Sequence, residues 1–288
     1  MPKTIYIIPV WKNSELSRKA ISTALDQPDC AVIAIDNNSM DGGGVIEMFE
    51  DWREKKIENL ILIENKENLG WVGGINQGIE IAKEKYPDAE FYCFLNNDVE
   101  LPTDFWDKIE PHFAEEDTGA VGPIGNNVSG LHDYNVKGYP NHHEVKFLIG
   151  FCFVVRRKLI DQIGGLDPIF GWGLSDDLDI SLRIRKFGYR LFIARDCRVF
   201  HHGSKGVELR FNNDEIINKV LPNLLYLSIL FAFVITIMPR SSYLMIIASY
   251  LNLSIWGGLC FYYSFDLSQL RNIEGYNALE IVSEPKNP

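Results

Sequence analysis

Short apolar runs alternate with helical patterns along the first third of the chain, and this order constrains the fold more than any other feature of the sequence. The apolar runs at 4–8, 31–35, 60–63 and 91–95 predict strands, and the segments at 15–25, 45–55 and 74–85 predict helices. Strands that are apolar throughout and separated by helices are typical of a parallel sheet covered on both faces. The sequence therefore predicts an α/β fold with a mostly parallel sheet.

Polar side chains follow three of these predicted strands: PVWKN at 9–13, DNNS at 36–39 and NND at 96–98. One polar strand end is ordinary turn chemistry, because Asn and Asp favour turns. In open α/β sheets, however, ligands bind beyond the carboxyl ends of the strands. Three polar ends in one sheet therefore favour a shared ligand site over three unrelated turns.

The second half of the chain carries a weaker pattern. Residues 119–139 are rich in Gly, Asn and Pro and predict a loop, whereas the apolar run at 145–155 predicts a strand. A helix is expected at 176–187 and a further short strand within 190–200. His201 and His202 follow that strand; a histidine can bind metal or phosphate, although two neighbouring histidines are more often structural.

The composition changes after residue 215. Between 220 and 265 the only charged residue is Arg240, and the uncharged stretch 220–238 is long enough to span a bilayer as a helix. A pair of helices that packs on the rest of the protein or on another subunit is the alternative. We therefore expect a catalytic domain at 1–215, a hydrophobic helical hairpin at 216–265 and a polar tail at 266–288.

Charge and cysteine content exclude several classes of protein. The net charge of −11 argues against a broad basic face for nucleic acid, so a phosphate ligand would need a metal ion to offset the acidity. The five cysteines are scattered without a CxxC pair, which argues against a disulfide scaffold or a structural zinc site. With no secretory signal pattern at 5–10, we expect a cytoplasmic protein.

The glycine-rich segment at 65–78, NKENLGWVGGINQG, follows a predicted strand and opens a predicted helix. Gly70, Gly73 and Gly74 permit close approach of the backbone to a ligand, and a helix N-terminus favours an anion. The alternative is a glycine-rich turn that only lets the helix pack.

The acidic segment at 171–183, GWGLSDDLDISLR, opens the last predicted helix. Acidic residues in a first turn suit the helix dipole, and Asp179 lies four residues before Arg183, where the two can pair. Asp177 points about 100° away from Asp176, so we expect it to be free to face a cleft. A carboxylate there, beside Trp172, suits a general base that acts on a hydroxyl.

In this order, several stretches together resemble the family 2 glycosyltransferases of the GT-A fold, especially their bacterial rhamnosyltransferase-like branch. They are IIPVWKN, AIDNNSMDGG, ENLGWVGGINQGI, FLNNDVEL, GFCFVVRRKLIDQIGGLDPIFGWGLSDDLDISLRIRKFGY and VFHHGS. The resemblance covers about residues 3–210 and implies a GT-A (Rossmann-like) sheet with helices on both faces.

The resemblance also implies roles for individual residues. The nucleotide-sugar pocket would be lined by Pro9, Val10, Asn13, Asp36, Asn38, Asn68, Gly70, Gly73, Asn76, Asn96 and Asn97. Asn96-Asn97-Asp98 would be the DXD-type motif, with Asn96 in place of its first acid. A divalent metal, Mg²⁺ or Mn²⁺, would be bound by Asp98 and His201.

For the catalytic carboxylates, the resemblance implies that Asp176 and Asp177 match the family's Glu-Asp pair. Asp177 would be the base that deprotonates the acceptor, and Asp176 replaces the more usual Glu. Trp172 and Gly173 would contact the acceptor.

The implied enzyme is an inverting, divalent-metal-dependent glycosyltransferase of polysaccharide biosynthesis. Its partners would be a nucleotide-diphosphate sugar and a glycan or lipid-linked acceptor, with no nucleic acid. The segment 220–265 makes a membrane a candidate partner and the cytoplasmic face of that membrane the expected location; a homo-oligomer is a further candidate.

Two alternatives to this function remain. A nucleotidyltransferase-like sugar-phosphate enzyme would need a basic loop after the first strand, where Lys12 is the only basic residue. The other is a non-catalytic nucleotide-sugar-binding protein on the same fold.

Overall fold

The computed structural model describes residues 2–126, 141–173 and 176–203. These residues belong to the first compact unit of the chain, Met1–Glu208. The predicted hydrophobic hairpin at 216–265 and the tail at 266–288 lie outside the described residues. Within the described ranges, no helix has both the length and the apolar character needed to cross a membrane.

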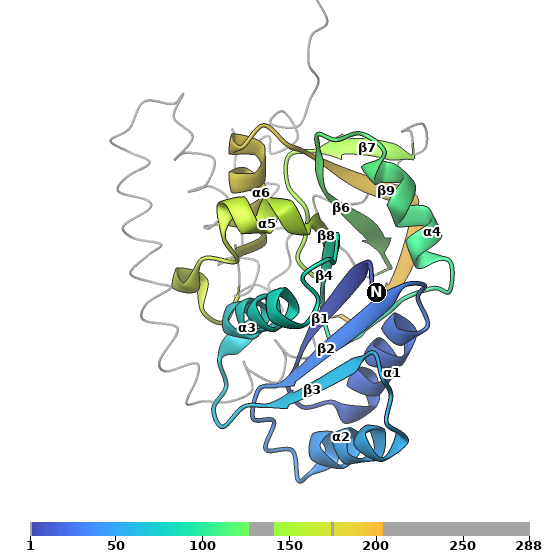
Figure 1. The fold of residues 1–288 in the computed structure, drawn as a ribbon, viewed down its shortest axis with the longest axis vertical. Helices are drawn as coiled ribbons and strands as arrows, with labels where there is room; N and C mark the ends of the chain where they lie inside the picture. The colour runs from blue at the N-terminus through green and yellow to red at the C-terminus, as the bar shows by residue number, and fades with distance from the viewer. Residues whose placement is uncertain (1, 127–140, 174–175, 204–288) are drawn as a thin grey trace, which may run out of the picture. The chain divides into compact units, whose positions relative to one another are not determined.

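The predicted alternation of strands and helices is confirmed in the first part of the chain (Figure 1). The elements are β1 Thr4–Val10, α1 Ser14–Leu25, β2 Cys30–Asp36, α2 Gly44–Lys55, β3 Leu60–Glu64, α3 Gly70–Lys85 and β4 Phe91–Leu95. The third helix begins at Gly70, four residues before its predicted start, so part of the glycine-rich segment is helical.

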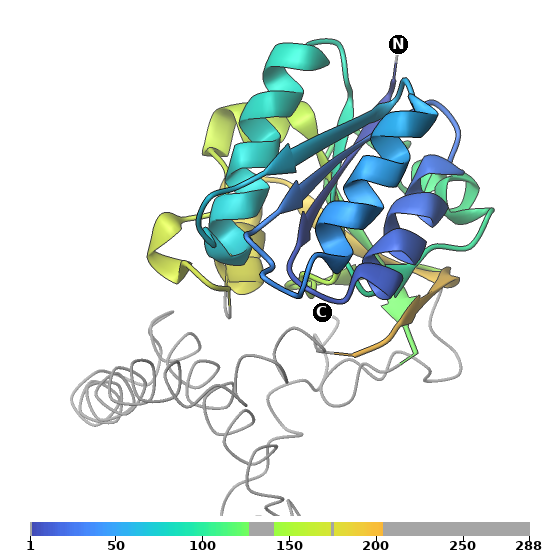
Figure 2. The same cartoon turned by 90° about the horizontal axis from the view of Figure 1, so that it is seen from below.

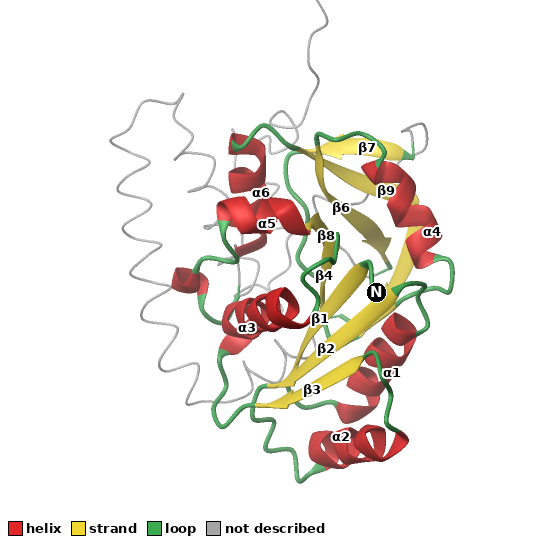
Figure 3. Ribbon diagram, viewed as in Figure 1, coloured by secondary structure: helices red, strands yellow, loops and turns green. Residues whose placement is uncertain are grey.

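The remaining elements follow in the second part of the described chain. They are β5 Val99–Glu100, α4 Phe105–Ile109, the 3₁₀ helix η1 Glu110–Phe113, β6 Thr118–Gly125, β7 His142–Val145, β8 Cys152–Arg156, α5 Arg157–Ile163, the 3₁₀ helix η2 Pro168–Phe170, α6 Asp176–Lys186 and β9 Arg190–His201. Figure 3 separates these helices from the strands by colour.

The sheet is mostly parallel where the sequence predicts it to be. Its strand order is β3-β2-β1-β4-β8-β6-β9-β5, and β7 pairs with β9. The strands β3, β2, β1 and β4 run parallel to one another. Strand β8 then runs antiparallel to both β4 and β6, and β6 is parallel to β9. The carboxyl ends of β1, β2 and β4 therefore meet at one edge.

Helices cover both faces of the sheet (Figure 2). On one face, α1, α2 and α4 bury apolar side chains such as Ile21, Phe49 and Phe105 against the strands. On the other, α3, α5 and α6 do the same with side chains such as Ile75 and Ile184. Because successive side chains of a strand point to opposite faces, a strand covered on both sides must be apolar throughout, as the sequence shows.

Two expectations for the second half are wrong. The stretch 119–139 predicted as a loop begins inside β6, because its small residues suit a buried strand under α6; residues 127–139 lie outside the described residues. A Cβ on Gly119 would lie 2.7 Å from Ile184 Cγ2, so a larger side chain has no room there. The single strand predicted at 145–155 is also wrong: β7 ends at Val145, β8 begins at Cys152, and the two strands have different partners.

Candidate active site

The polar ends of β1 and β2 lie side by side, as predicted for strands that run parallel. Val10 pairs with Asp36 in the register of the two strands. The backbone N–H of Lys12 donates to Ser39 Oγ at 2.8 Å and ties the two turns together. Asn13 (φ 51°) and Asn38 (φ 55°) adopt left-handed backbone conformations, which asparagine tolerates better than most residues.

Asp36 is buried, with 4% of its surface exposed. Both the backbone N–H and the hydroxyl of Ser39 donate hydrogen bonds to its carboxylate. Burial raises the pKa of Asp36, whereas the two bonds from Ser39 lower it. The carboxylate is therefore held in one orientation beside the predicted nucleotide pocket.

A network of side-chain amides fixes the start of α3. Asn37 Nδ2 donates to the carbonyl of Gly70 at 3.0 Å, and Asn65 Nδ2 donates to Asn37 Oδ1 at 3.1 Å. Asn65 also exchanges two hydrogen bonds with Gln77. Asn68 Oδ1 accepts from the N–H of Gly70 at 2.8 Å. The residues of the glycine-rich segment thus shape the turn as well as line the edge of the sheet.

The glycines of this segment lie against protein atoms. Gly70 has φ 73°, and a Cβ there would be 2.7 Å from the carbonyl oxygen of Gly171. A Cβ on Gly73 would be 2.7 Å from Leu69 Cβ, and one on Gly74 would be 3.0 Å from Pro9 Cβ. These contacts support the packing alternative for the glycines.

Asn76 has a structural role that the sequence did not reveal. Its Nδ2 donates to the carbonyl of Leu166, and its Oδ1 accepts from the N–H of the same residue, both at 2.8 Å. The two bonds satisfy backbone groups of the segment that follows α5. Both the nitrogen and the oxygen of the Asn76 amide therefore bond to protein partners.

Asp98 and His201 are brought together by the pairing of β5 with β9, which sets Val99 opposite His201. His201 Nε2 lies 3.3 Å from Asp98 Oδ1, and the two side chains are 12% and 7% exposed. His202 points elsewhere, with its Nε2 2.6 Å from Glu100 Oε1. The geometry thus distinguishes His201 from its neighbour as the partner of Asp98.

One carboxylate and one imidazole fit a divalent ion that also binds a diphosphate. Such ions often take few protein ligands, because phosphate oxygens and water fill the remaining positions. Across the described ranges, no three His, Cys, Asp or Glu side chains gather as a metal-binding group. Asn97, predicted beside this pair, instead donates to Ser17 Oγ at 2.8 Å.

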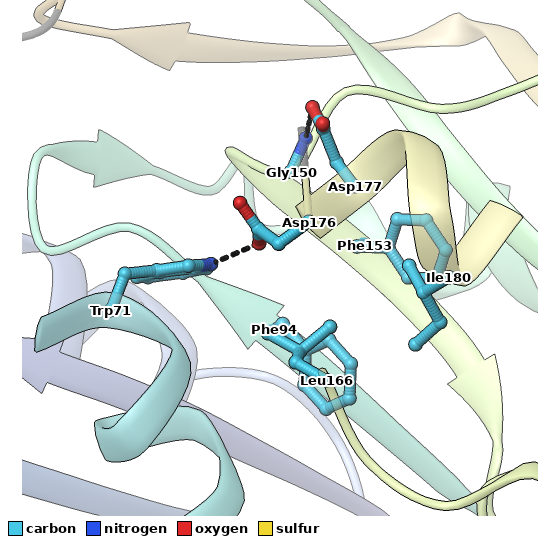
Figure 4. Close-up of a pocket in the computed structure, with 8 residues that line it drawn as sticks. All are labelled: Trp71, Phe94, Gly150, Phe153, Leu166, Asp176, Asp177 and Ile180. Atoms are coloured by element: carbon cyan, nitrogen blue, oxygen red, sulfur yellow. Dashed lines mark hydrogen bonds between the residues drawn. The ribbon is translucent and has the colours of Figure 1, made fainter. Parts of the chain in front are cut away.

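The two carboxylates that open α6 lie in a pocket on the face covered by α3 (Figure 4). The pocket is partly open to solvent and is lined by Trp71, Phe94, Gly150, Phe153, Leu166, Asp176, Asp177 and Ile180. The floor of the pocket is apolar, and Asp176 and Asp177 are its acidic groups. The expected pairing of Asp179 with Arg183 is confirmed at 2.8 Å.

Asp176 and Asp177 have different surroundings. Asp176 is 5% exposed and accepts a hydrogen bond from Trp71 Nε1 at 3.0 Å. The side chain of Asp177 accepts from the backbone N–H of Gly150 at 3.1 Å and from that of Leu178 at 2.8 Å, so it is not free of partners as expected. Burial raises the pKa of Asp177, and these amides lower it.

The predicted acceptor residues border this region. Trp172 is 43% exposed, and Gly173 has φ 100° and donates its N–H to Phe170. Several residues that line the pocket were not predicted from the sequence, and among them Trp71 is the one whose side chain bonds to a predicted catalytic residue. The only signal for it was an aromatic side chain inside the glycine-rich segment.

The two halves of the site are joined by consecutive residues. Gly150 donates to Asp177, and the next residue, Phe151, stacks its ring on His201 with the centroids 5.1 Å apart. The carbonyl of Phe151 also accepts from the N–H of Asn96 at 2.9 Å. A single turn of chain thus connects the Asp98–His201 pair to the α6 carboxylate.

A sheet of this order, covered by helices on both faces and polar at its carboxyl edge, has the GT-A fold of glycosyltransferases. Residues 6–164 match the family model described as glycosyl transferase family 2, and the chain belongs to that family.

Among curated relatives, an uncharacterized protein of Mycobacterium tuberculosis is 31% identical over 159 residues, which are 50% of this chain and 58% of the relative. The chain thus covers little more than half the length of this relative. The O-antigen biosynthesis protein RfbC of Myxococcus xanthus is 23% identical over 233 residues, 70% of this chain and 17% of RfbC.

Solved structures share the fold at low sequence identity. A mannosyltransferase from Pyrobaculum calidifontis in complex with GDP-Man and Mn²⁺ matches with a TM-score of 0.59 at 17% identity, over 97% of this chain and 82% of that one. GalNAc-T7 with UDP, GalNAc and Mn²⁺ matches with a TM-score of 0.53 at 13% identity, over 70% and 44% of the two chains. TarS of S. aureus matches with a TM-score of 0.54 at 12% identity, over 96% and 77%.

Proposed function

We propose that this protein transfers a sugar from a nucleotide-diphosphate sugar to a hydroxyl of a glycan or lipid-linked acceptor, with inversion at the sugar carbon. The observation that carries the proposal is the Gly150-Phe151 bridge, which connects an aspartate suited to be a base with an Asp–His pair suited to a metal. Family membership and the nucleotide-sugar complexes of proteins with this fold support it.

The donor would bind along the carboxyl edge of β1, β2 and β4. Asp36 is oriented there by Ser39, and the first turn of α3 closes one side. A divalent ion held by Asp98 and His201 would supply the positive charge that the diphosphate leaving group requires and that an acidic chain does not offer.

The acceptor hydroxyl would lose its proton to Asp177 Oδ while its oxygen attacks the sugar carbon. The bond from that carbon to the phosphate oxygen breaks in the same displacement, and the nucleoside diphosphate leaves with the electron pair. Burial raises the pKa of Asp177, which makes its carboxylate a stronger base than an ordinary aspartate. Asp176 lies beside it and is oriented by Trp71.

The test is a screen of UDP-, dTDP- and GDP-sugars with Mn²⁺ and a panel of hydroxyl acceptors, in which the released nucleotide is identified. The proposal expects release of nucleoside diphosphate that stops with a chelator and returns with Mn²⁺. Release of pyrophosphate would overturn it in favour of a nucleotidyltransferase. Calorimetric binding of a nucleotide sugar without turnover of any acceptor would favour the non-catalytic alternative.

We also propose that the uncharged segment 220–265 associates with a membrane, which would suit a lipid-linked acceptor at its cytoplasmic face. The support is the length of sequence without charge apart from Arg240. The test compares membrane fractionation of the full chain with that of a chain ending at 215. Equal distribution of the two between membrane and supernatant would contradict the proposal.

A further inference from the structure

The first turn of α3 is docked onto the segment that leads into α6. Trp71 Nε1 donates to Asp176 Oδ2 at 3.0 Å, across 105 residues of sequence (Figure 4). The N–H of Val72 donates to the carbonyl of Gly171 at 3.1 Å. Gly70 lies so close to the same carbonyl that a Cβ would come within 2.7 Å of it. A side-chain bond, a backbone bond and a tight contact thus join the two segments.

The same turn of α3 is held from its other side by the end of β2. Asn37, which is 3% exposed, donates to the carbonyl of Gly70 at 3.0 Å and accepts from Asn65. The turn at 70–72 therefore lies between the edge proposed for the nucleotide and the helix that carries Asp177. Hydrogen bonds on both sides of this turn fix the orientation of the groups that they join. A displacement of the turn on the nucleotide side would therefore also displace the start of α6.

We propose that Trp71 is a positioning residue for the base, and that Asp176 acts as its hydrogen-bond partner rather than as a second catalytic carboxylate. The inference rests on the proposed function, because it concerns the base of that reaction. Asp176 is nearly buried, so an N–H that faces its carboxylate stabilises one orientation more strongly than it would in water.

The consequence for Asp177 is geometric. It follows Asp176 in the first turn of α6, and its bond to Gly150 N is 3.1 Å long. When the first turn shifts, this carboxylate moves away from Gly150 and from the acceptor hydroxyl. A displacement of about 1 Å in a reacting group reduces the rate by roughly 100-fold.

The role assigned to Asp176 requires an acceptor oxygen and not a negative charge. Asparagine at 176 keeps an oxygen that accepts from the indole N–H, whereas phenylalanine at 71 removes the donor but keeps an aromatic ring. Trp71→Phe and Asp176→Asn therefore separate a positioning role from a chemical one. Trp106→Phe is the matched control, since Trp106 is also buried (4% exposed) but lies in α4 on the opposite face of the sheet.

The experiment measures kcat, KM for the nucleotide sugar and the pH profile of kcat/KM in the full-length protein. For Trp71→Phe we expect kcat to fall about 10- to 100-fold, with KM for the donor within about threefold and the acid limb of the profile shifted. We expect Asp176→Asn to lower kcat by less than Trp71→Phe does, because it keeps an acceptor for the indole N–H, and the control Trp106→Phe to keep kcat within about threefold of the parent. An unchanged kcat and pH profile in Trp71→Phe overturns the proposal, as does a loss in Asp176→Asn as large as that in Asp177→Asn.

A spectroscopic arm tests the contact without turnover. The indole ¹⁵N–H resonance of Trp71, identified by its absence in Trp71→Phe, should exchange slowly with D₂O and should shift in Asp176→Asn while those of the other tryptophans stay in place. Exchange as fast as that of an exposed indole, or no shift, overturns the pairing. If no donor is turned over by any variant while the resonance behaves as expected, the proposed function fails and the Trp71–Asp176 contact stands.

Discussion

At the scale of single residues, Asp177 shows how burial and hydrogen bonding oppose each other at a candidate base. Burial raises its pKa above the ordinary 3.8, and the amides of Gly150 and Leu178 lower it again. The same two amides fix the direction of the carboxylate. The residue is thus both oriented and made more basic.

Replacing Asp177 with Asn should reduce kcat by about 100- to 10,000-fold, the range that one general base contributes. In the parent protein, activity should fall as the pH decreases through the raised pKa of Asp177, at a higher pH than an ordinary aspartate would set. The measurement is the pH profile of kcat/KM. Near-normal turnover in Asp177→Asn would contradict the assignment.

The stability of Asp177→Asn gives an independent check on the same shift. Because the pKa is raised in the folded state, the favourable contribution of Asp177 exists below the unfolded pKa and is lost as the pH rises through the folded pKa. As the pH rises through the folded pKa of Asp177, the free energy of unfolding of the parent should therefore fall relative to that of the Asn variant, as measured by urea denaturation at a series of pH values. A difference between the two proteins that does not change with pH would contradict the raised pKa.

Asp98 and His201 should both be needed for metal binding. Calorimetry with Mn²⁺ and a nucleoside diphosphate should show affinity lowered at least about tenfold in Asp98→Ala and in His201→Ala, because each removes one of few protein ligands. His202→Ala is the control, since His202 bonds to Glu100 instead and should leave the affinity within about threefold. Equal losses for the two histidines would contradict the assignment.

At the scale of elements, α3 is the part of the structure that most of the site depends on. Its glycines let it approach β1 and the 171 carbonyl closely, and a Cβ on Gly78 would lie 2.2 Å from Ile7 Cγ2. Its polar residues Asn76 and Gln77 bind neighbouring segments. Close packing and hydrogen bonds therefore place its first turn at the site.

Asn76→Ala should lower the free energy of unfolding by about 2 kcal/mol, because it leaves the N–H and C=O of Leu166 without this partner. Urea denaturation measures the change. Glu80→Ala, on an exposed part of the same helix, is the matched control and should change stability by less than about 0.5 kcal/mol. If Asn76→Ala instead keeps its stability and loses affinity for the donor, the amide contacts the nucleotide.

At the scale of the whole molecule, the site is built within the first compact unit of the chain, Met1–Glu208. We expect a chain that ends after Glu208 to unfold cooperatively and to bind Mn²⁺ with a nucleoside diphosphate within about threefold of the full-length affinity, because the proposed ligands all precede that point. Chemical denaturation and calorimetry are the measurements. Failure of this shorter chain to fold would place later residues in its core.

The same shorter chain allows a test of its core. Cys30, Cys93, Cys152 and Cys197 are all buried and free, and burial raises the pKa of Cys30 to about 11. A thiol reagent at pH 8 should therefore label none of them in the native protein and all four in denaturant. Rapid labelling without denaturant would show that the sheet is open.

Much of this architecture could be predicted from the sequence, because it depends on residues that are near one another in the chain. Strands covered on both faces must be apolar throughout, and helices between them force a parallel order, so the first part of the fold and the meeting of polar strand ends follow from pattern alone. The pairing of Asp179 with Arg183 follows from helical spacing in the same way. The association of Asp98 with His201 came from family resemblance, since nothing local links residues so far apart.

Only the tertiary structure decided the contacts made across long sequence separations. The sequence of the buried strand β6 predicts a loop, because the small residues that its packing requires, Gly119 against Ile184 of α6 and Gly122 against Leu148, have low strand propensity. The family resemblance predicted that Asn76 binds the donor, whereas in the structure its amide bonds to the backbone of Leu166. The hydrogen bond from Trp71 to Asp176 joins residues 105 positions apart, and no sequence pattern predicts it. The sequence by itself determined the strands and helices of the first part of the chain and the edge of the sheet at which its polar strand ends meet. The packing of α3 and α6 determined which side chains are held at the candidate site, because that depends on neighbours that the chain order does not specify.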